Sequence, residues 1–171
     1  QGIMYTNHGH MKIESFADAD WEGSRDDRRS TTGFCVYLGG NLVSWKSKKQ
    51  HIVSRSSAES EYRAMSKAVC EIMWIKHLLK ECNLEFEEPA RLWCDNKAAI
   101  HIASNPIFHE RTKHIEIDCH FIRDKIQNGE VTTHYVNTQE QPADVLTKAV
   151  SGDRLKYLKS KLGLIDIYNP T

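Results

Sequence analysis

Apolar and polar side chains alternate along three early segments of the chain. From residue 11 to residue 18 the alternation is regular, and it recurs in shorter form over residues 33–38 and 42–45. Strict alternation is typical of a strand with one buried face. Gly39-Gly-Asn separates the second and third segments and is a hairpin signal. The pattern therefore predicts three consecutive strands, paired as an antiparallel meander.

After residue 56 the apolar period changes from two to about 3.6 residues, which predicts a long helix. One stripe of this helix is apolar and is made by Ala64, Ala68, Ile72, Ile75 and Leu79. Ser56 is a candidate N-cap, because Glu59 follows it at the capping-box position. Asn83 and Pro89 mark the end of the helix.

The remaining elements are shorter. They are a strand over 90–94, helices over 96–103 and 109–127, a strand over 131–136, and helices over 139–149 and 151–162. This order predicts an α/β fold, with a mixed sheet flanked by helices. Residues 1–10 are polar and aperiodic, so we expect a flexible leader there. Residues 11–150 form the predicted domain, and 151–171 form a C-terminal helix and tail.

The net charge of the chain is zero, from 23 basic and 23 acidic residues. No global field therefore draws the chain onto nucleic acid, and any such binding must come from local patches or a partner. No apolar run is long enough to span a bilayer. The five cysteines are odd in number, and several fall at apolar positions. These features are typical of reduced core thiols in an intracellular protein.

Four acidic residues stand at the edges of predicted elements: Asp18, Glu61, Asp95 and Asp144. Asp18 and Asp95 close strands, and neighbouring strand ends bring their side chains together. Acids at such positions also form turns or meet the helix dipole, so each one alone says little. Carboxylates gathered in one site must be neutralised by protons or metal ions. Hard oxygen ligands select Mg²⁺ or Mn²⁺, and a pair of such ions is the usual apparatus for breaking a phosphodiester.

Several motifs together resemble a known family. They are Ala17-Asp-Ala-Asp-Trp-Glu-Gly, Ser56-Ser-Ala-Glu-Ser-Glu-Tyr-Arg-Ala, Trp93-Cys-Asp-Asn-Lys-Ala-Ala, and Arg111-Thr-Lys-His-Ile-Glu-Ile-Asp-Cys-His with Ala143-Asp-Val-Leu-Thr-Lys. In this order the chain resembles the ribonuclease H domain of copia-type (Ty1/copia) retrotransposon polyproteins, and looks like a plant member. The resemblance implies a ribonuclease H-like fold, with a five-stranded mixed sheet whose first three strands are antiparallel. It also implies that two Mg²⁺ or Mn²⁺ ions serve to hydrolyse the RNA strand of RNA–DNA hybrids.

Carried over one at a time, the family's catalytic and metal-binding acids fall on the four positions named above. Two of them have a competing neighbour, since Asp20 is an alternative to Asp18 and Glu59 is an alternative to Glu61. We expect Asp18, which lies between the other contributors, to bridge the two ions. The chain departs from the family in one respect. Many ribonucleases H carry a histidine on the loop before the last acid, and residues 137–143 contain none.

A basic stretch between the third strand and the long helix is the candidate contact to substrate, and it contains Lys46, Lys48, Lys49 and Arg55. Such a stretch tracks phosphates, although a solvated hairpin has the same composition. Asn96 is a candidate donor to the 2′-hydroxyl that distinguishes RNA from DNA. The implied partners are an RNA–DNA hybrid and an upstream reverse transcriptase domain of the same polyprotein, in the cytoplasm, a virus-like particle or the nucleus, without a membrane.

Two other functions share part of this pattern. Transposases and integrases of the same fold use three acids, and their last acid is usually a glutamate, whereas here the glutamate comes second. A domesticated, non-catalytic domain would bind hybrid or another protein and would not need the acids, yet all four are present. The pattern therefore favours the ribonuclease.

Overall fold

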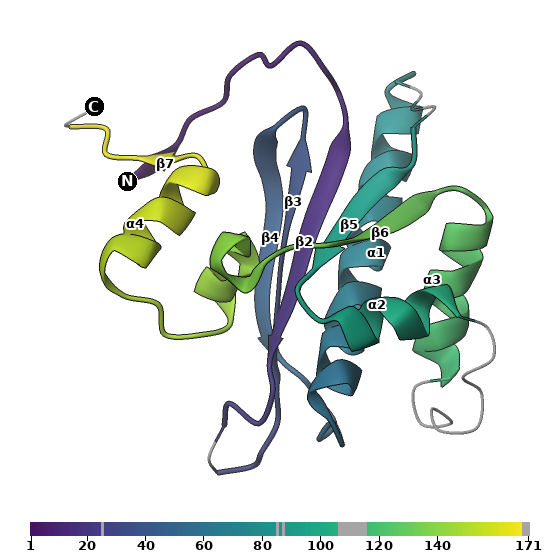
Figure 1. Ribbon diagram of the computed structural model, residues 1–171. Coiled ribbons are helices and arrows are strands. Elements are labelled where there is room, and N and C mark those ends of the chain that lie inside the picture. Colours follow the sequence, from purple (N-terminus) through teal and green to yellow (C-terminus); the bar gives the residue numbers. More distant parts are fainter. Residues whose placement is uncertain (25, 85, 87, 106–115, 169–171) are drawn as a thin grey trace.

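The computed structural model describes residues 1–24, 26–84, 86, 88–105 and 116–168. Its centre is a five-stranded sheet in the order β4-β3-β2-β5-β6 (Figure 1). The strands are β2 (Ile13–Asp20), β3 (Thr31–Leu38), β4 (Asn41–Lys49), β5 (Ala90–Cys94) and β6 (Val131–Tyr135). β2 is the middle strand, antiparallel to β3 and parallel to β5. The predicted mixed sheet with an antiparallel meander is therefore confirmed.

Within the described residues, four α-helices and two short 3₁₀ helices surround the sheet. They are α1 (Ser57–Glu81), α2 (Lys97–Ser104), α3 (Glu116–Gln127), α4 (Gly152–Lys161), η2 (Thr138–Glu140) and η3 (Pro142–Leu146). The predicted helix over 109–127 is described only from Glu116, and residues 109–115 lie outside the described residues. The single helix predicted over 139–149 is wrong, because the chain forms η2 and η3 there. Pro142 lacks the N–H that would continue a helix from η2, and it begins η3 instead.

The N-terminal end of α1 is built by the predicted cap. Ser56 Oγ accepts a hydrogen bond from the Glu59 N–H at 3.2 Å. The Glu59 carboxylate accepts from the Arg55 N–H at 2.9 Å and pairs with Arg63 at 3.0 Å. Three contacts thus commit Glu59 to the start of the helix. The helix ends at Glu81 with Cys82 as its C-cap, and Asn83 takes a left-handed conformation with φ of 59°.

The two faces of the sheet are covered by different helices. On one face, Ala17 and Phe34 pack with Tyr62 and Met65 of α1 in the main core, which α2 and α3 extend. On the other face, where α4 lies (Figure 1), a smaller cluster joins residues of β3 to η3 and to the end of α4. Successive side chains alternate across a sheet, and directly paired residues share a face. Asp18, which pairs with Gly33, therefore points to the η3 face, away from α1.

A glycine allows η3 to approach the sheet closely. A Cβ atom at Gly33 would lie 2.5 Å from Thr147 Cγ2, 2.9 Å from Leu146 Cβ and 3.1 Å from the Ala143 carbonyl oxygen. The buried Gln141 side chain fixes the same approach, since its Nε2 donates to the Ala17 carbonyl at 3.0 Å. The segment that carries Asp144 is thereby held directly against β2 and β3.

The two ends of the described chain pair with each other. β1 (Gly2–Ile3) and β7 (Leu164–Ile165) form a separate two-stranded antiparallel sheet, which the aperiodic leader and tail did not predict (Figure 1). Cys35 and Cys94 are buried thiols as expected, whereas Cys70 and Cys82 are exposed, so the prediction of core thiols is wrong for these two. Within the residues that the structure describes, no helix is long and apolar enough to cross a membrane.

We predict that Gly33→Ala lowers the free energy of unfolding by about 1–3 kcal/mol, because the added methyl group overpacks the contact with η3. For a chain of this size, each kcal/mol corresponds to roughly 2–4 °C in Tm. Thermal melts of the purified variant measure the change. Thr31→Ala, at a half-buried position of the same strand, is the control and should change Tm little. An unchanged Tm for Gly33→Ala would show that η3 is not held against this glycine.

Candidate active site

The four predicted acids converge from four elements. β2 and β5 run parallel with Phe16 opposite Trp93, so two residues further along Asp18 lies beside Asp95, just past the end of β5. Asp144 comes from η3 on the same face of the sheet. Glu61 comes from the second turn of α1. Strand register, helix capping and the close approach of η3 each position one part of the site.

Two overlapping groups of ligand atoms define the centre. One oxygen each from Asp18, Asp95 and Asp144 lie within 4.8 Å of one another. A second group joins Glu61, Asp95 and the thiol of Cys94 within the same distance. Asp95 belongs to both groups, whereas we expected Asp18 to hold the bridging position. Among the described residues, the alternatives Asp20 and Glu59 belong to neither group.

Asp18 is fully buried, and two neighbours from the η3 side contact its carboxylate. Lys148 Nζ donates to Asp18 Oδ1 at 2.9 Å, and the Thr147 hydroxyl donates to Oδ2. Burial raises the pKa of Asp18 to about 6, even though Lys148 and Thr147 favour the charged form. The nearby Asp144 adds to the increase. Desolvation is therefore the dominant effect on this carboxylate.

Asp144 is also fully buried, and two cations contact it. Lys148 Nζ donates to its Oδ1 at 2.8 Å, and the Arg154 guanidinium donates to its Oδ2. Arg154 also donates to the Thr138 carbonyl at 2.8 Å, and the Thr138 hydroxyl donates to Asp95 Oδ2 at 2.8 Å. One hydrogen-bonded network therefore joins the three aspartates to α4 and the η2 turn.

The environment of Glu61 favours its protonated form. Burial raises its pKa to about 9, with further contributions from the charges of Asp18 and Asp95. The Cys94 thiol lies 3.8 Å from Glu61 Oε2, and burial raises the pKa of that thiol well above its usual value. Without a metal ion this end of the site thus favours neutral, protonated groups.

The network contains cations that the sequence analysis did not assign. We expected protons or metal ions to neutralise the acids, and the structure adds Lys148 and Arg154. A sequence signal existed for Lys148, because it stands four residues after Asp144, the spacing at which side chains meet on one helical face. Arg154 stands ten residues after Asp144, beyond a loop, and no local pattern connects them. Thr138, Gln141, Thr147 and Cys94 were likewise missed.

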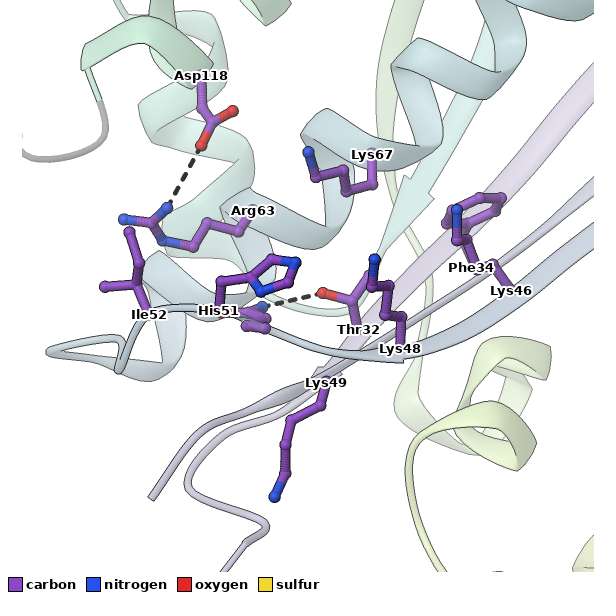
Figure 2. A pocket seen from close by; sticks show the side chains of 11 residues that line it. Thr32, Phe34, Lys46, Lys48, Lys49, His51, Ile52, Arg63, Lys67 and Asp118 are labelled. Carbon is purple, nitrogen blue, oxygen red and sulfur yellow. Dashed lines mark hydrogen bonds and ion pairs between the residues drawn. The ribbon is translucent and has the colours of Figure 1, made fainter. Parts of the chain in front are cut away.

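The predicted basic stretch divides between two sides of the sheet. Lys46 and Lys48 line a cavity of about 310 Å³ on the α1 face, together with His51, Arg63 and Lys67 (Figure 2). Lys49 also lines the cavity, but its ammonium group points away from Lys46 and Lys48 (Figure 2) and pairs with Asp27 at 3.2 Å. The structure therefore brings Lys46 and Lys48 together on the face opposite Asp18.

The other predicted substrate contacts lie at helix starts. Arg55 is exposed beside the N-cap of α1. Asn96 caps α2, since its Oδ1 accepts from the Ala99 N–H at 3.0 Å, and any contact from its side chain to a hydroxyl would come from Nδ2. His134 lies in β6 rather than on a loop, and its ring packs against Trp93 at a centroid distance of 4.9 Å.

The donor set fits divalent metal ions of the hard class. Carboxylate oxygens are the ligands that Mg²⁺ and Mn²⁺ prefer. Two oxygens bound to one Mg²⁺ lie at most about 4.2 Å apart, so the oxygens of the three aspartates, within 4.8 Å, need only a small contraction. The short distances between these oxygens and their burial thus suit a divalent ion. The Cys94 thiol is the soft ligand atom in the two described groups.

The fold of the chain is that of ribonuclease H. It superimposes on LC11-RNase H1 in complex with an RNA/DNA hybrid with a TM-score of 0.58 at 13% identity, covering 80% of this chain and 94% of that one. The N-terminal RNase H domain of a Mycobacterium tuberculosis protein gives a TM-score of 0.57 at 13% identity, covering 88% and 97%. These similarities define the class of fold.

The sequence itself matches plant transposon proteins. It is 42% identical over 163 residues to the retrovirus-related Pol polyprotein from transposon RE1 of Arabidopsis thaliana. It is 35% identical over 152 residues to the corresponding polyprotein from transposon TNT 1-94 of Nicotiana tabacum. These matches cover 95% and 89% of this chain but 11% of each relative. No family model matches. The chain belongs to the copia-type retrotransposon Pol polyproteins, of which it spans this small part.

We predict that Glu61→Gln stabilises the metal-free protein at alkaline pH. A carboxyl group whose pKa is raised on folding contributes most below its unfolded pKa, and this contribution is lost as pH rises toward the folded value of about 9. The gain in the variant should therefore grow between pH 4.5 and pH 9. It should reach on the order of 1 kcal/mol or more, with roughly 2–4 °C in Tm for each kcal/mol.

Thermal melts in EDTA across this pH range measure the effect, and Glu59→Gln is the matched control. Glu59 caps α1 and pairs with Arg63, so its substitution should lower Tm instead. Equal Tm values for Glu61→Gln and the parent protein at high pH would contradict the burial of a costly charge at Glu61.

Proposed function

We propose that the chain is a metal-dependent ribonuclease H that hydrolyses the RNA strand of RNA–DNA hybrids during retrotransposon reverse transcription. The observation that carries the proposal is the convergence of Asp18, Asp95 and Asp144 within 4.8 Å, next to Glu61, on a ribonuclease H fold. The relatives are Pol polyproteins, which supports a partner reverse transcriptase upstream in the same polypeptide. We also propose that this work takes place inside the cell, in the cytoplasm, a virus-like particle or the nucleus.

Two Mg²⁺ or Mn²⁺ ions suit the two overlapping groups of acids. We propose that Asp18, Asp95 and Asp144 hold one ion, and that Glu61 and Asp95 hold the other. Bound at these positions, such ions supply an activated water and stabilise charge on the leaving oxygen. The protein's own contribution is positional, because Thr138 and Arg154 orient the carboxylates of Asp95 and Asp144.

The loop before the last acid offers no histidine for proton transfer. Residues 137–143 form η2 and the start of η3 and contain no histidine, and His134 is held against Trp93. We propose that protons pass through solvent, with slower turnover than in family members that carry the histidine. General acid–base catalysis contributes typically about 10²–10⁴-fold, which is the scale of the loss.

We propose that the hybrid contacts the protein beyond the acids through Lys46, Lys48 and Arg55, with Asn96 Nδ2 near the ribose. Lys46 and Lys48 gather with Lys67 around one cavity (Figure 2), and this concentration of charge suits a phosphate backbone. Lys49 contributes less, because Asp27 and Ser24 already engage its ammonium group. The zero net charge of the chain implies weak, salt-sensitive binding.

Cleavage of a labelled RNA–DNA hybrid tests the proposed activity. With Mg²⁺ or Mn²⁺ the protein should cut the RNA strand and leave single-stranded RNA and duplex DNA intact. Asp95→Asn and Asp18→Asn should each lower the rate by about 100-fold or more, because each removes a charged ligand. Asp153→Asn, at an exposed position of α4, is the control for loss of one negative charge.

Three outcomes would contradict the proposal or part of it. Cleavage that persists in EDTA would exclude metal-dependent hydrolysis. Binding of hybrid without cleavage would favour the domesticated, non-catalytic function. Full activity in Asp18→Asn with loss of activity in Asp20→Asn would show that the neighbouring aspartate is the ligand.

A second prediction concerns affinity for the hybrid. The double substitution Lys46→Ala and Lys48→Ala should weaken binding and reduce the dependence of log K on log salt by about 2, one for each phosphate contact. Lys49→Ala is the matched control on the same strand, and we expect a smaller effect because Lys49 is already paired. Salt titrations by fluorescence anisotropy measure both. Equal effects from the two changes would indicate that the cavity is not a phosphate contact.

A further inference from the structure

The ammonium group of Lys148 lies between two fully buried aspartates. Its Nζ is 2.9 Å from Asp18 Oδ1 and 2.8 Å from Asp144 Oδ1. Both carboxylates have an exposed fraction of zero, while the lysine side chain is 33% exposed. A cation in this place is the expected partner for two carboxylates that water cannot reach.

The position of this ammonium group conflicts with that of a metal ion. Asp18 and Asp144 are two of the three aspartates proposed to hold one divalent ion. Lys148 Nζ fills the space between one oxygen of each, and an ion bound to the same two oxygens cannot share that space. Like charges at such close range would also repel strongly in a site that excludes water.

We propose that Lys148 is a displaceable counter-ion, which neutralises the acids when no metal is bound and leaves its place when the metal ion enters. This inference rests on the proposed function, because it takes Asp18 and Asp144 as metal ligands. Lys148 is a positioning residue in this role. It holds the metal-free aspartates in place through its two contacts, and it competes with the ion for them.

The contacts around the site explain why Lys148, rather than Arg154, is the group that moves. Arg154 is anchored twice, to Asp144 and to the Thr138 carbonyl oxygen at 2.8 Å. The described contacts of the Lys148 ammonium group are with the two aspartates alone. The backbone N–H of Lys148 donates to the Asp144 carbonyl oxygen at 2.9 Å, so its side chain can move while its main chain stays.

Lysine also suits this role chemically. Its ammonium group is a compact, strongly hydrated charge on a flexible four-carbon stem, whereas the planar fork of arginine is suited to fixed, bidentate contacts. The partial exposure of Lys148 provides a route by which the ammonium group reaches water. Arg154 stays behind and holds Asp144 through its second oxygen.

The first test measures metal binding directly, in Lys148→Met. Mn²⁺ binding, followed by electron paramagnetic resonance, should tighten roughly tenfold. The Tm of the same variant should fall in EDTA and recover in Mg²⁺, so that the metal-induced rise in Tm exceeds that of the parent protein. A merely structural lysine would lower both Tm values equally.

Lys156→Met is the matched control. Lys156 is an exposed lysine of α4 that pairs with the exposed Asp153 at 3.4 Å. This contact does not involve any of the four acids of the site. Its removal should leave Mn²⁺ affinity and the metal-induced rise in Tm unchanged.

The second test uses the unmodified protein and does not depend on how a variant folds. Amine-directed labelling followed by mass spectrometry should show Lys148 protected in EDTA and more reactive in saturating Mg²⁺. Lys156 should label equally in both conditions. Equal labelling of Lys148 with and without Mg²⁺ would overturn the inference.

The outcomes distinguish the displacement of Lys148 from the proposed metal-dependent function. Parent protein that binds Mn²⁺, with unchanged or weaker binding in Lys148→Met, overturns the displacement of Lys148 but leaves the proposed metal site intact. Failure of parent and variant alike to bind Mn²⁺ overturns the metal site and the inference together. Tighter binding in Lys148→Met with unchanged binding in Lys156→Met supports both.

Discussion

The burial of the Asp18 carboxylate in the middle of the sheet is the constraint on which the rest of the site depends. A carboxylate without access to water must be protonated, paired or bound to a metal ion. Lys148 and Thr147 reach it because η3 lies directly on β3, and this approach requires the absence of a side chain at Gly33. The space at one glycine thus determines whether a buried acid can be kept at the centre of the fold.

Sequence reasoning singled out the acids because each one lies near the boundary of a predicted element. Alternation predicted that the first strand ends at Asp18, although β2 continues to Asp20. The capping signal at Ser56 set the phase of α1 and thus of Glu61, and the apolar strand before Asp95 placed that residue. Such local signals show where along the chain an element begins or ends. The cations that balance the acids follow from contacts across space, so Arg154 left no trace in any local pattern.

The predicted helix over 139–149 was wrong for a related reason. Helical period alone favours one continuous helix there, but Pro142 interrupts the hydrogen bonding and the buried Gln141 is tied to β2. Two short 3₁₀ turns result, and they place Asp144 over the sheet beside Asp18. A local prediction of secondary structure cannot include a tie to a strand that lies 124 residues earlier in the chain.

The division of charge between the two faces of the sheet follows from the same register. Asp18 pairs with Gly33, and Lys46 pairs with the next residue of β3, Phe34. Because consecutive residues of a strand face opposite sides, the side chains of Asp18 and Lys46 point to opposite faces of the sheet. The three aspartates therefore gather on the side of η3, while Lys46 and Lys48 gather beside α1. This separation keeps the lysines of β4 from neutralising the acids permanently, and it leaves that task to Lys148, a cation on the acids' own face. We therefore expect the lysines proposed to contact phosphate and the acids proposed to hold metal ions to keep their charges independently of each other.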